Sequence, residues 1–269
     1  MNLQRVEQLQ DPRLAPYRDV RDRTLRGESL FLAEGDLVVE RLLDSPFPVT
    51  SVLVVDRALE RVRPMLEAKV GPGVPIYVVP FEGRPDVVGF PFHQGVMAAG
   101  ERRVFWTLEK LTESSAAAKR RVIVVLPDIT KPDNVGVVFR SAAAFGAEGV
   151  LLGERACDPL SRRGLRVSMG GVLQLPWRKS SDIVADLERL RSEFGYTVWG
   201  TVLDPDAADV RQTQWPDRVA LCFGNEYDGL DAETLAHCDV RVTLPMRAGV
   251  DSLNLGVSAG IFLYAALRA

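Results

Sequence analysis

The sequence has few of the side chains that build metal centres and disulfide bonds. Its 269 residues include two histidines and three cysteines, and Cys157, Cys222 and Cys238 show no C-x-x-C spacing. This composition disfavours a zinc site, so we expect no bound metal. An odd number of thiols, in a chain that starts with polar residues and no targeting segment, is typical of the reducing cytoplasm, where we expect the protein to reside.

Long apolar segments and phosphate-binding fingerprints are also missing. The most apolar stretch, LNLGVSAGIFLYAALRA at residues 253–269, is short for a membrane span and contains Asn254 and Ser258. We therefore expect a buried helix there and no membrane partner. The strand-to-helix turn within residues 219–235 has neither the full G-x-G-x-x-G pattern nor the lysine of a P-loop, which disfavours a nucleotide-dependent α/β enzyme.

Lysine is scarce, so most of the positive charge is carried by arginine. The formal net charge is −3, and only five of the 33 Lys and Arg residues are lysines. A negative net charge argues against a nucleic-acid partner only if the positive groups are spread evenly over the surface. Arginine suits bidentate contacts with phosphate, although a bias in genome composition explains the same excess equally well.

The chain is long enough for two globular domains, with 46% hydrophobic and 26% charged residues. Residues 1–100 combine strand-like and amphipathic segments and predict a small α/β domain. Residues 101–121 are charged and rich in Ser and Ala, which is typical of a linker. Residues 122–269 alternate strands with helices, which predicts an α/β domain with a mostly parallel sheet covered on both faces. The strands expected in and next to this second domain lie within residues 121–127, 149–153, 172–177, 196–203, 218–224 and 239–245.

Three of these strands are followed by polar loops that enter a helix. Because ligands of parallel sheets bind beyond the carboxyl ends of the strands, three such loops predict one pocket. In the first loop, PDNVGVVFRSAAAFGA at residues 132–147, Asn134 is placed to cap a helix that carries Arg140. The second, FGNEYDGL at residues 223–230, is a glycine-bearing turn that lets a ligand approach the backbone.

The third loop carries more polar side chains than a helix start needs. It is LPMRAGVDSLNLGVSAG at residues 244–260, and it contains Asp251, Ser252 and Asn254. An N-cap formed by Asp251 or Ser252 accounts for only one of the three. Buried polar groups require hydrogen-bond partners, so the segment is either a ligand site at a helix N-terminus or a tight turn with partners of its own.

In this order and spacing, the three segments resemble the motifs of the SpoU (TrmH) branch of the SPOUT RNA ribose 2'-O-methyltransferases. The resemblance covers the C-terminal domain. The N-terminal domain contains FLAEGDLVVERLL at residues 31–43 and HQGVMAA at residues 93–99, and through these segments it is similar to the L30e-like RNA-binding domains of several of these enzymes. It implies a C-terminal trefoil knot, S-adenosylmethionine as cofactor, and a homodimer whose site is completed near the dimer interface.

The resemblance also implies roles for single residues. Arg140 would act as a base or as the cation that stabilises the attacking ribose oxygen, and we favour the cation because guanidinium stays protonated. Asn134 would position the RNA, Glu226 would order the loop and the arginine, and Ser252 and Asn254 would be satisfied by the knot and the cofactor site. The residues expected to bind the cofactor are Gly224, Leu244, Leu253, Thr201 and Val202. The residues expected to contact RNA are Arg23, Arg26, Arg162, Arg163 and Arg166, each equally well explained as part of a solvated charged surface.

We therefore expect an S-adenosylmethionine-dependent ribose 2'-O-methyltransferase that acts on RNA. Ribosomal RNA is the first expected substrate, because an L30e-like domain suits kinked or looped RNA. Transfer RNA is the alternative substrate. A catalytically silent RNA-binding or ribosome-assembly factor is the alternative function, and the presence of all five catalytic-motif residues argues against it.

Overall fold

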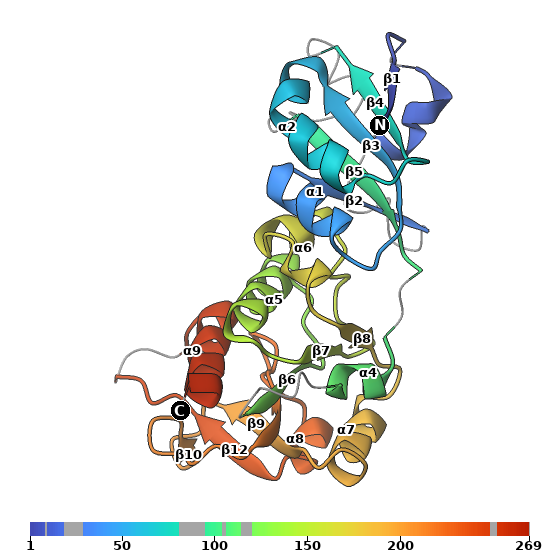
Figure 1. Ribbon diagram of the computed structural model, residues 1–269. Helices are drawn as coiled ribbons and strands as arrows, with labels where there is room; N and C mark the ends of the chain where they lie inside the picture. Colours follow the sequence, from blue (N-terminus) through green and yellow to red (C-terminus); the bar gives the residue numbers. More distant parts are fainter. Residues whose placement is uncertain are drawn as a thin grey trace. The chain divides into compact units, whose positions relative to one another are not determined.

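The chain divides into two compact units, which are both seen in the computed structural model (Figure 1). The first consists of residues 1–104 and 158–174, and the second of residues 105–157 and 175–269. Segment 158–174, assigned above to the second domain, thus belongs to the first unit. The structure describes residues 1–8, 10–18, 29–80, 95–103, 106–113, 120–247 and 252–268, so Arg23, Arg26 and Asp251 lie outside the described residues.

The first unit is built on a mixed five-stranded sheet of order β1-β4-β3-β5-β2. β1, β4 and β3 are parallel, whereas β5 is antiparallel to both β3 and β2. Gly35, with φ +91°, makes the turn between β2 and α1. The elements are β1 (Asn2–Arg5), β2 (Leu30–Glu34), α1 (Asp36–Leu43), β3 (Val49–Val55), α2 (Asp56–Lys69), β4 (Pro75–Val79), β5 (Val96–Glu101) and α6 (Arg162–Val167), with a 3-10 helix at Pro12–Tyr17.

Polar contacts hold segment 158–174 in the first unit. Arg102 forms a bidentate pair with Asp158, with N···O distances of 3.1 and 2.7 Å. The Nε atom of Arg162, at the start of α6, lies 2.9 Å from a carboxylate oxygen of Glu34. These pairs join residues that are far apart in sequence, so the local sequence pattern gives no sign of them.

The second unit contains a seven-stranded sheet of order β10-β12-β9-β11-β6-β7-β8, and every strand pair in it is parallel. The predicted parallel α/β architecture is thereby confirmed. Its strands are β6 (Arg121–Leu126), β7 (Gly149–Leu152), β8 (Trp177–Lys179), β9 (Thr197–Val202), β10 (Ala208–Asp209), β11 (Arg218–Cys222) and β12 (Val240–Thr243). Its helices are α4 (Leu108–Thr112), α5 (Pro132–Phe145), α7 (Ile183–Ser192), α8 (Ala232–Ala236) and α9 (Leu255–Arg268).

One predicted strand is displaced. Residues 172–177 were expected to form it, but Gly171–Leu173 is a 3-10 turn and β8 begins only at Trp177. A short apolar run does not distinguish a strand from a buried turn. Gly170, with φ +81°, starts the turn.

Alternating side chains of the strands face two layers of helices. Ile123 and Val125 of β6 belong to a buried cluster that includes Leu108 of α4 and Leu187 of α7. On the other face α5 packs against α9 (Figure 1). No helix within the described ranges is both long and apolar enough to cross a membrane.

Candidate functional site

A cavity of about 330 Å³ opens at the carboxyl ends of β9, β11 and β12. We call it the motif cavity, because the second and third sequence motifs line it. The five residues predicted to bind the cofactor all lie in its wall, and Glu226 and Ser252 line it as well. These five are Thr201, Val202, Gly224, Leu244 and Leu253.

The wall of the motif cavity is largely apolar. The rings of Phe223, which follows β11, and Phe262 of α9 meet edge to face with centroids 5.9 Å apart. Met246 and Leu255 add further apolar surface. Such a wall with a few polar groups is typical of sites that enclose a small molecule.

The loop after β11 folds back on itself at Gly224. A Cβ atom on this residue would overlap the backbone of Gly229 and Leu230, so no larger residue is accommodated. Asn225 and Gly229 exchange backbone hydrogen bonds of 3.0 and 3.2 Å, and Gly229 has φ +71°. Gly224 and Gly229 also line the motif cavity, and because glycine carries no side chain, backbone atoms form this part of the wall, which we call the glycine cradle.

Asn254 and Asn134 connect the third motif to the first. The Nδ2 atom of Asn254 donates to Oδ1 of Asn134 over 3.2 Å, and Oδ1 of Asn254 accepts from the backbone N–H of Gly256 over 2.9 Å. Asn254 thus satisfies the first turn of α9, where Asp251 or Ser252 was considered as the cap. A Cβ atom on Gly256 would overlap Val137 of α5, so this glycine permits the close approach of the two helices.

Asn134 does not cap α5, contrary to the prediction. The helix begins at Pro132, after Lys131 at the N-cap position, which places Asn134 in the first turn with 5% of its surface exposed. Proline favours the first helical position because its fixed φ suits the helix and its missing N–H is not needed there. The amide oxygen of Asn134 accepts from Asn254 instead.

Glu226 carries a carboxylate that lacks hydrogen bonds within the described residues. Its side chain is 17% exposed, and neither oxygen has a hydrogen-bond partner. The nearest cation is Lys131, whose Nζ atom lies 3.9 Å from Oε1. A largely buried carboxylate is costly without donors, so this group is suited to accept hydrogen bonds from a ligand.

The structure separates Arg140 from the other catalytic candidates. Arg140 is exposed on α5, does not line the motif cavity, and makes no hydrogen bond or ion pair within the described ranges. Glu226 and Ser252 lie in the wall of the cavity, while Asn134 and Asn254 bind each other.

The arginines proposed for RNA contact differ in their surroundings. Arg162 is 19% exposed and paired with Glu34, so its guanidinium already has an anionic partner. Arg163 and Arg166 are exposed on α6. All three belong to the first unit.

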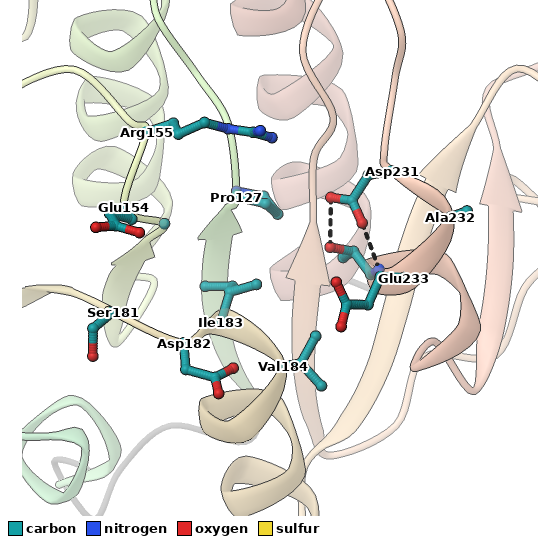
Figure 2. Close-up of a pocket in the computed structure, with 12 residues that line it drawn as sticks. Pro127, Glu154, Arg155, Ser181, Asp182, Ile183, Val184, Asp231, Ala232 and Glu233 are labelled. Atoms are coloured by element: carbon teal, nitrogen blue, oxygen red, sulfur yellow. Dashed lines mark hydrogen bonds between the residues drawn. The ribbon is translucent and has the colours of Figure 1, made fainter.

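A second cavity, of about 540 Å³, was not predicted from the sequence; we call it the acidic cavity. It lies beyond the carboxyl ends of β6 and β7 and beside the first turns of α7 and α8 (Figure 2). Asp231 accepts hydrogen bonds from the backbone N–H and the hydroxyl of Thr234, over 2.8 and 2.9 Å. Its lining includes Glu154, Arg155, Asp182, Asp231 and Glu233.

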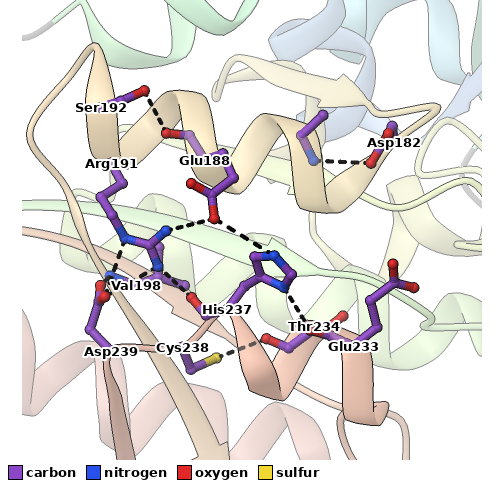
Figure 3. Close-up of polar contacts among 11 residues, drawn as sticks. Asp182, Glu188, Arg191, Ser192, Val198, Glu233, Thr234, His237, Cys238 and Asp239 are labelled. Carbon is purple, nitrogen blue, oxygen red and sulfur yellow. Dashed lines mark hydrogen bonds and ion pairs between the residues drawn. The ribbon is translucent and has the colours of Figure 1, made fainter.

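A polar network fixes α7 and α8 beside the sheet (Figure 3). Arg191 of α7 donates to Glu188, to the carbonyl of His237 and to Asp239, over 2.8, 2.6 and 3.2 Å. The other carboxylate oxygen of Asp239 accepts from the backbone N–H of Val198 in β9 over 2.7 Å. These bonds join α7 to the segment that follows α8 and to β9, so the network stabilises the second unit.

Comparison with known proteins agrees with this geometry. The family model described as the SpoU rRNA Methylase family matches residues 121–264. A Mycobacterium bovis protein named as an uncharacterized tRNA/rRNA methyltransferase is 33% identical over 276 residues, covering 100% of this chain and 93% of the relative. A 23S rRNA (guanosine-2'-O-)-methyltransferase of Acinetobacter baylyi is 28% identical, covering 78% of this chain and 84% of the relative.

A solved structure supports the same assignment. The crystal structure of an AdoMet-bound rRNA methyltransferase from Sinorhizobium meliloti superimposes with a TM-score of 0.81 at 25% identity, covering 100% of this chain and 98% of that chain. The chain belongs to the SpoU rRNA methylase family, and its resemblance to the SpoU branch is thereby confirmed.

Proposed function

We propose that this protein transfers the methyl group of S-adenosylmethionine to a ribose 2'-hydroxyl of ribosomal RNA. The observation that carries the proposal is the motif cavity, where the residues of two SpoU motifs meet around a backbone cradle that only glycine permits at position 224. Relatives named as rRNA methyltransferases support rRNA as the substrate. We also propose a cytoplasmic location, which the three free thiols support.

The motif cavity offers the cofactor an apolar wall with a few polar groups. Gly224 and the backbone around it would contact its polar groups, and Leu244 and Leu253 would pack against its apolar surface. When bound, S-adenosylmethionine supplies an electrophilic methyl group.

In this transfer the ribose oxygen would bond to the methyl carbon as the bond between that carbon and the sulfonium breaks, which would leave a neutral thioether, and the hydroxyl proton would pass to water. A ribose hydroxyl is a weak acid at neutral pH, so the negative charge that develops on the oxygen needs stabilisation. Arg140 supplies a permanent positive charge for this purpose, since guanidinium stays protonated. Glu226 is placed to accept hydrogen bonds from a ligand in the cavity, and the Asn134–Asn254 bond holds the loop before α9 against α5.

The active form is proposed to be a homodimer. Two features support it: Arg140 does not line the motif cavity of its own chain, and α9 exposes an apolar stripe. Val257, Ile261 and Tyr264 are 51%, 37% and 59% exposed, and their spacing places them on one side of the helix. Sedimentation equilibrium tests this proposal. If a second copy of the chain covers this stripe, the wild type should be a dimer and Ile261→Glu should be a monomer. A monomeric wild type would contradict the proposal.

The function is tested by transfer of labelled methyl groups to RNA from cells that lack the gene. Ribosomal and transfer RNA are assayed separately, and ribose methylation is then mapped in RNA from cells with and without the gene. Label in rRNA that depends on the gene supports the proposal. Label only in tRNA would make tRNA the substrate, and the absence of label in both would favour a silent RNA-binding factor.

A further inference from the structure

Tyr227 displays an aromatic ring at the motif cavity. It is 79% exposed, which is the largest exposure recorded for a large apolar side chain among the described residues, and it is part of the cavity lining. Single exposed apolar residues are common on protein surfaces. Exposure alone therefore assigns no role to the ring.

The backbone beneath Tyr227 is held in place. Oδ1 of Asn225 accepts hydrogen bonds from the backbone N–H groups of Tyr227 and Asp228, over 2.9 and 2.8 Å. Asn225 and Gly229 also pair through their backbones. The turn is thus held by its own hydrogen bonds and does not depend on burial of the Tyr227 ring. The ring is exposed on a loop with a defined conformation.

Lys131 lies over one face of the ring. Its Nζ atom is 4.7 Å from the ring centroid and 3.9 Å from Oε1 of Glu226. A cation at this distance is attracted to the aromatic face and restricts the ring's orientation. Because the ring is 79% exposed, its remaining surface is open to a ligand.

The surrounding charges indicate which part of an RNA would occupy this surface. Glu226 and Asp228 flank Tyr227 in sequence and disfavour a phosphate directly over the ring, whereas an uncharged base is not repelled there. Every nucleobase has a face that stacks on an aromatic side chain. The ammonium of Lys131, which is 48% exposed, remains accessible to an anion.

We propose that Tyr227 and Lys131 form a nucleotide clamp. A base of the RNA stacks on the exposed surface of the Tyr227 ring, and Lys131 contacts the phosphate of the same nucleotide. The clamp rests on the proposed function, since that function supplies the RNA. It positions the nucleotide beside the methyl donor and takes no part in the chemical step.

The test measures methyl transfer by the full chain with rRNA from cells that lack the gene. Tyr227→Ala is expected to raise KM for RNA roughly tenfold, the scale of one lost base–aromatic stack, with kcat near wild type. The affinity for S-adenosylmethionine, measured by calorimetry, should not change. Tyr227→Phe and Tyr227→Trp should restore KM, because they restore an aromatic face. Tyr227→Leu should behave like Tyr227→Ala.

Lys131 provides the second arm of the test. Lys131→Gln is expected to raise KM and to lower the salt dependence of RNA binding by about one phosphate contact. Lys131→Arg should keep both properties near wild type. Lys110→Gln, at an exposed lysine paired with Glu113 on α4, is the matched control and should change neither.

Three outcomes overturn the clamp. An unchanged KM in Tyr227→Ala would refute base stacking on the ring. A normal KM in Tyr227→Leu would show that apolar contact is sufficient without an aromatic face. Wild-type salt dependence in Lys131→Gln would refute the phosphate contact. If wild-type protein methylates no RNA, the proposed function fails separately. Filter binding of the same rRNA to wild type and Tyr227→Ala then decides the clamp, because equal affinities contradict it.

Discussion

The motif cavity and the acidic cavity lie at the same edge of one parallel sheet, yet they differ in what their polar groups do. In the acidic cavity, Asp231 accepts a hydrogen bond from the first turn of α8 (Figure 2), and Asp182 accepts one from the first turn of α7 (Figure 3). Arg155 pairs with Asp128 at 2.9 Å. In the motif cavity, Glu226 has no hydrogen-bond partner within the described residues.

The difference shows why volume alone does not identify a site. The acidic cavity measures about 540 Å³ and the motif cavity about 330 Å³. Buried polar groups are normally hydrogen-bonded, so an unsatisfied carboxylate beside a glycine cradle indicates that a ligand completes the wall. In the acidic cavity, Asp182 and Asp231 already cap helices α7 and α8 and need no ligand for their hydrogen bonds. Paired substitutions, one in or near each cavity, test this distinction.

The largest difference in kcat is expected between substitutions of two exposed arginines. Arg140→Ala should lower kcat by at least about a hundredfold, the scale of a lost electrostatic donor in the transition state, with little change in cofactor affinity. Arg155→Ala, at the acidic cavity, should leave kcat near wild type. Arg140→Lys should recover only part of the rate, because an ammonium does not reproduce a planar guanidinium. Single-turnover rates at saturating RNA provide the measurement, and a wild-type rate for Arg140→Ala would refute its role.

A matched pair of glycines comes next. A Cβ atom on Gly224 would overlap Gly229, and one on Gly153 would overlap the carbonyl of Pro127 beside the acidic cavity. Both Ala variants should lose about 1–3 kcal/mol of stability through overpacking. Only Gly224→Ala should also weaken S-adenosylmethionine binding, by at least about tenfold, or 1.4 kcal/mol. Thermal unfolding and calorimetry separate the two effects. Equal loss of cofactor affinity would mean that both cavities serve one site.

The sequence predicted local features well and long-range contacts poorly. The strand β6 and the turn at Gly224 follow from short patterns of apolar residues and glycine. The residues predicted to bind the cofactor meet in one cavity wall, which the specific order and spacing of the motifs had indicated, while their role in cofactor binding stays a prediction. The pairing of segment 158–174 with the first unit depends on Glu34 and Arg102, which no pattern near Asp158 reveals.

Helix starts were the least predictable local detail. Asn134 was expected to cap α5, but Pro132 moved the start of the helix and left that amide to accept from Asn254. The expected trefoil knot stays a prediction, since residues 248–251 lie outside the described residues. Tyr227 lay within a motif, but its exposure depends on the fold and was not evident from the sequence.

Two helix caps give a smaller contrast. Asn254 accepts from Gly256 at the start of α9, and Asp182 accepts from Ala185 at the start of α7. Replacement of either by Ala should cost about 0.5–2 kcal/mol of stability. Asn254→Ala should also weaken cofactor binding, because it releases the segment that carries Leu253. Asp182→Ala should not. Urea unfolding measures the stability of both variants, and calorimetry measures their affinity for the cofactor. Normal cofactor affinity in Asn254→Ala would contradict the expected role of Asn254 in holding Leu253.

The smallest effect concerns Asp231 and pH. Burial raises the pKa of its carboxyl group, but hydrogen bonds from Thr234 together with those from backbone N–H groups of the same turn outweigh burial and bring the pKa below its ordinary value. A lowered pKa in the folded state stabilises the protein above the unfolded pKa of about 3.9, and this contribution is lost as the pH falls through the folded pKa. Asp231→Asn keeps a side chain that caps helices well but has no carboxyl group to titrate. The variant should therefore lose less stability than wild type as the pH falls from about 5 to 3.

Urea unfolding across this pH range measures the difference, with Glu233→Gln as a control for the loss of one neighbouring charge. An unchanged pH profile in Asp231→Asn would show that its carboxylate contributes nothing as an anion. Its affinity for S-adenosylmethionine at neutral pH should equal that of wild type, because Asp231 lines the acidic cavity and not the motif cavity. A strong loss of that affinity would show that the acidic cavity takes part in cofactor binding, and the distinction between the two cavities would then fail.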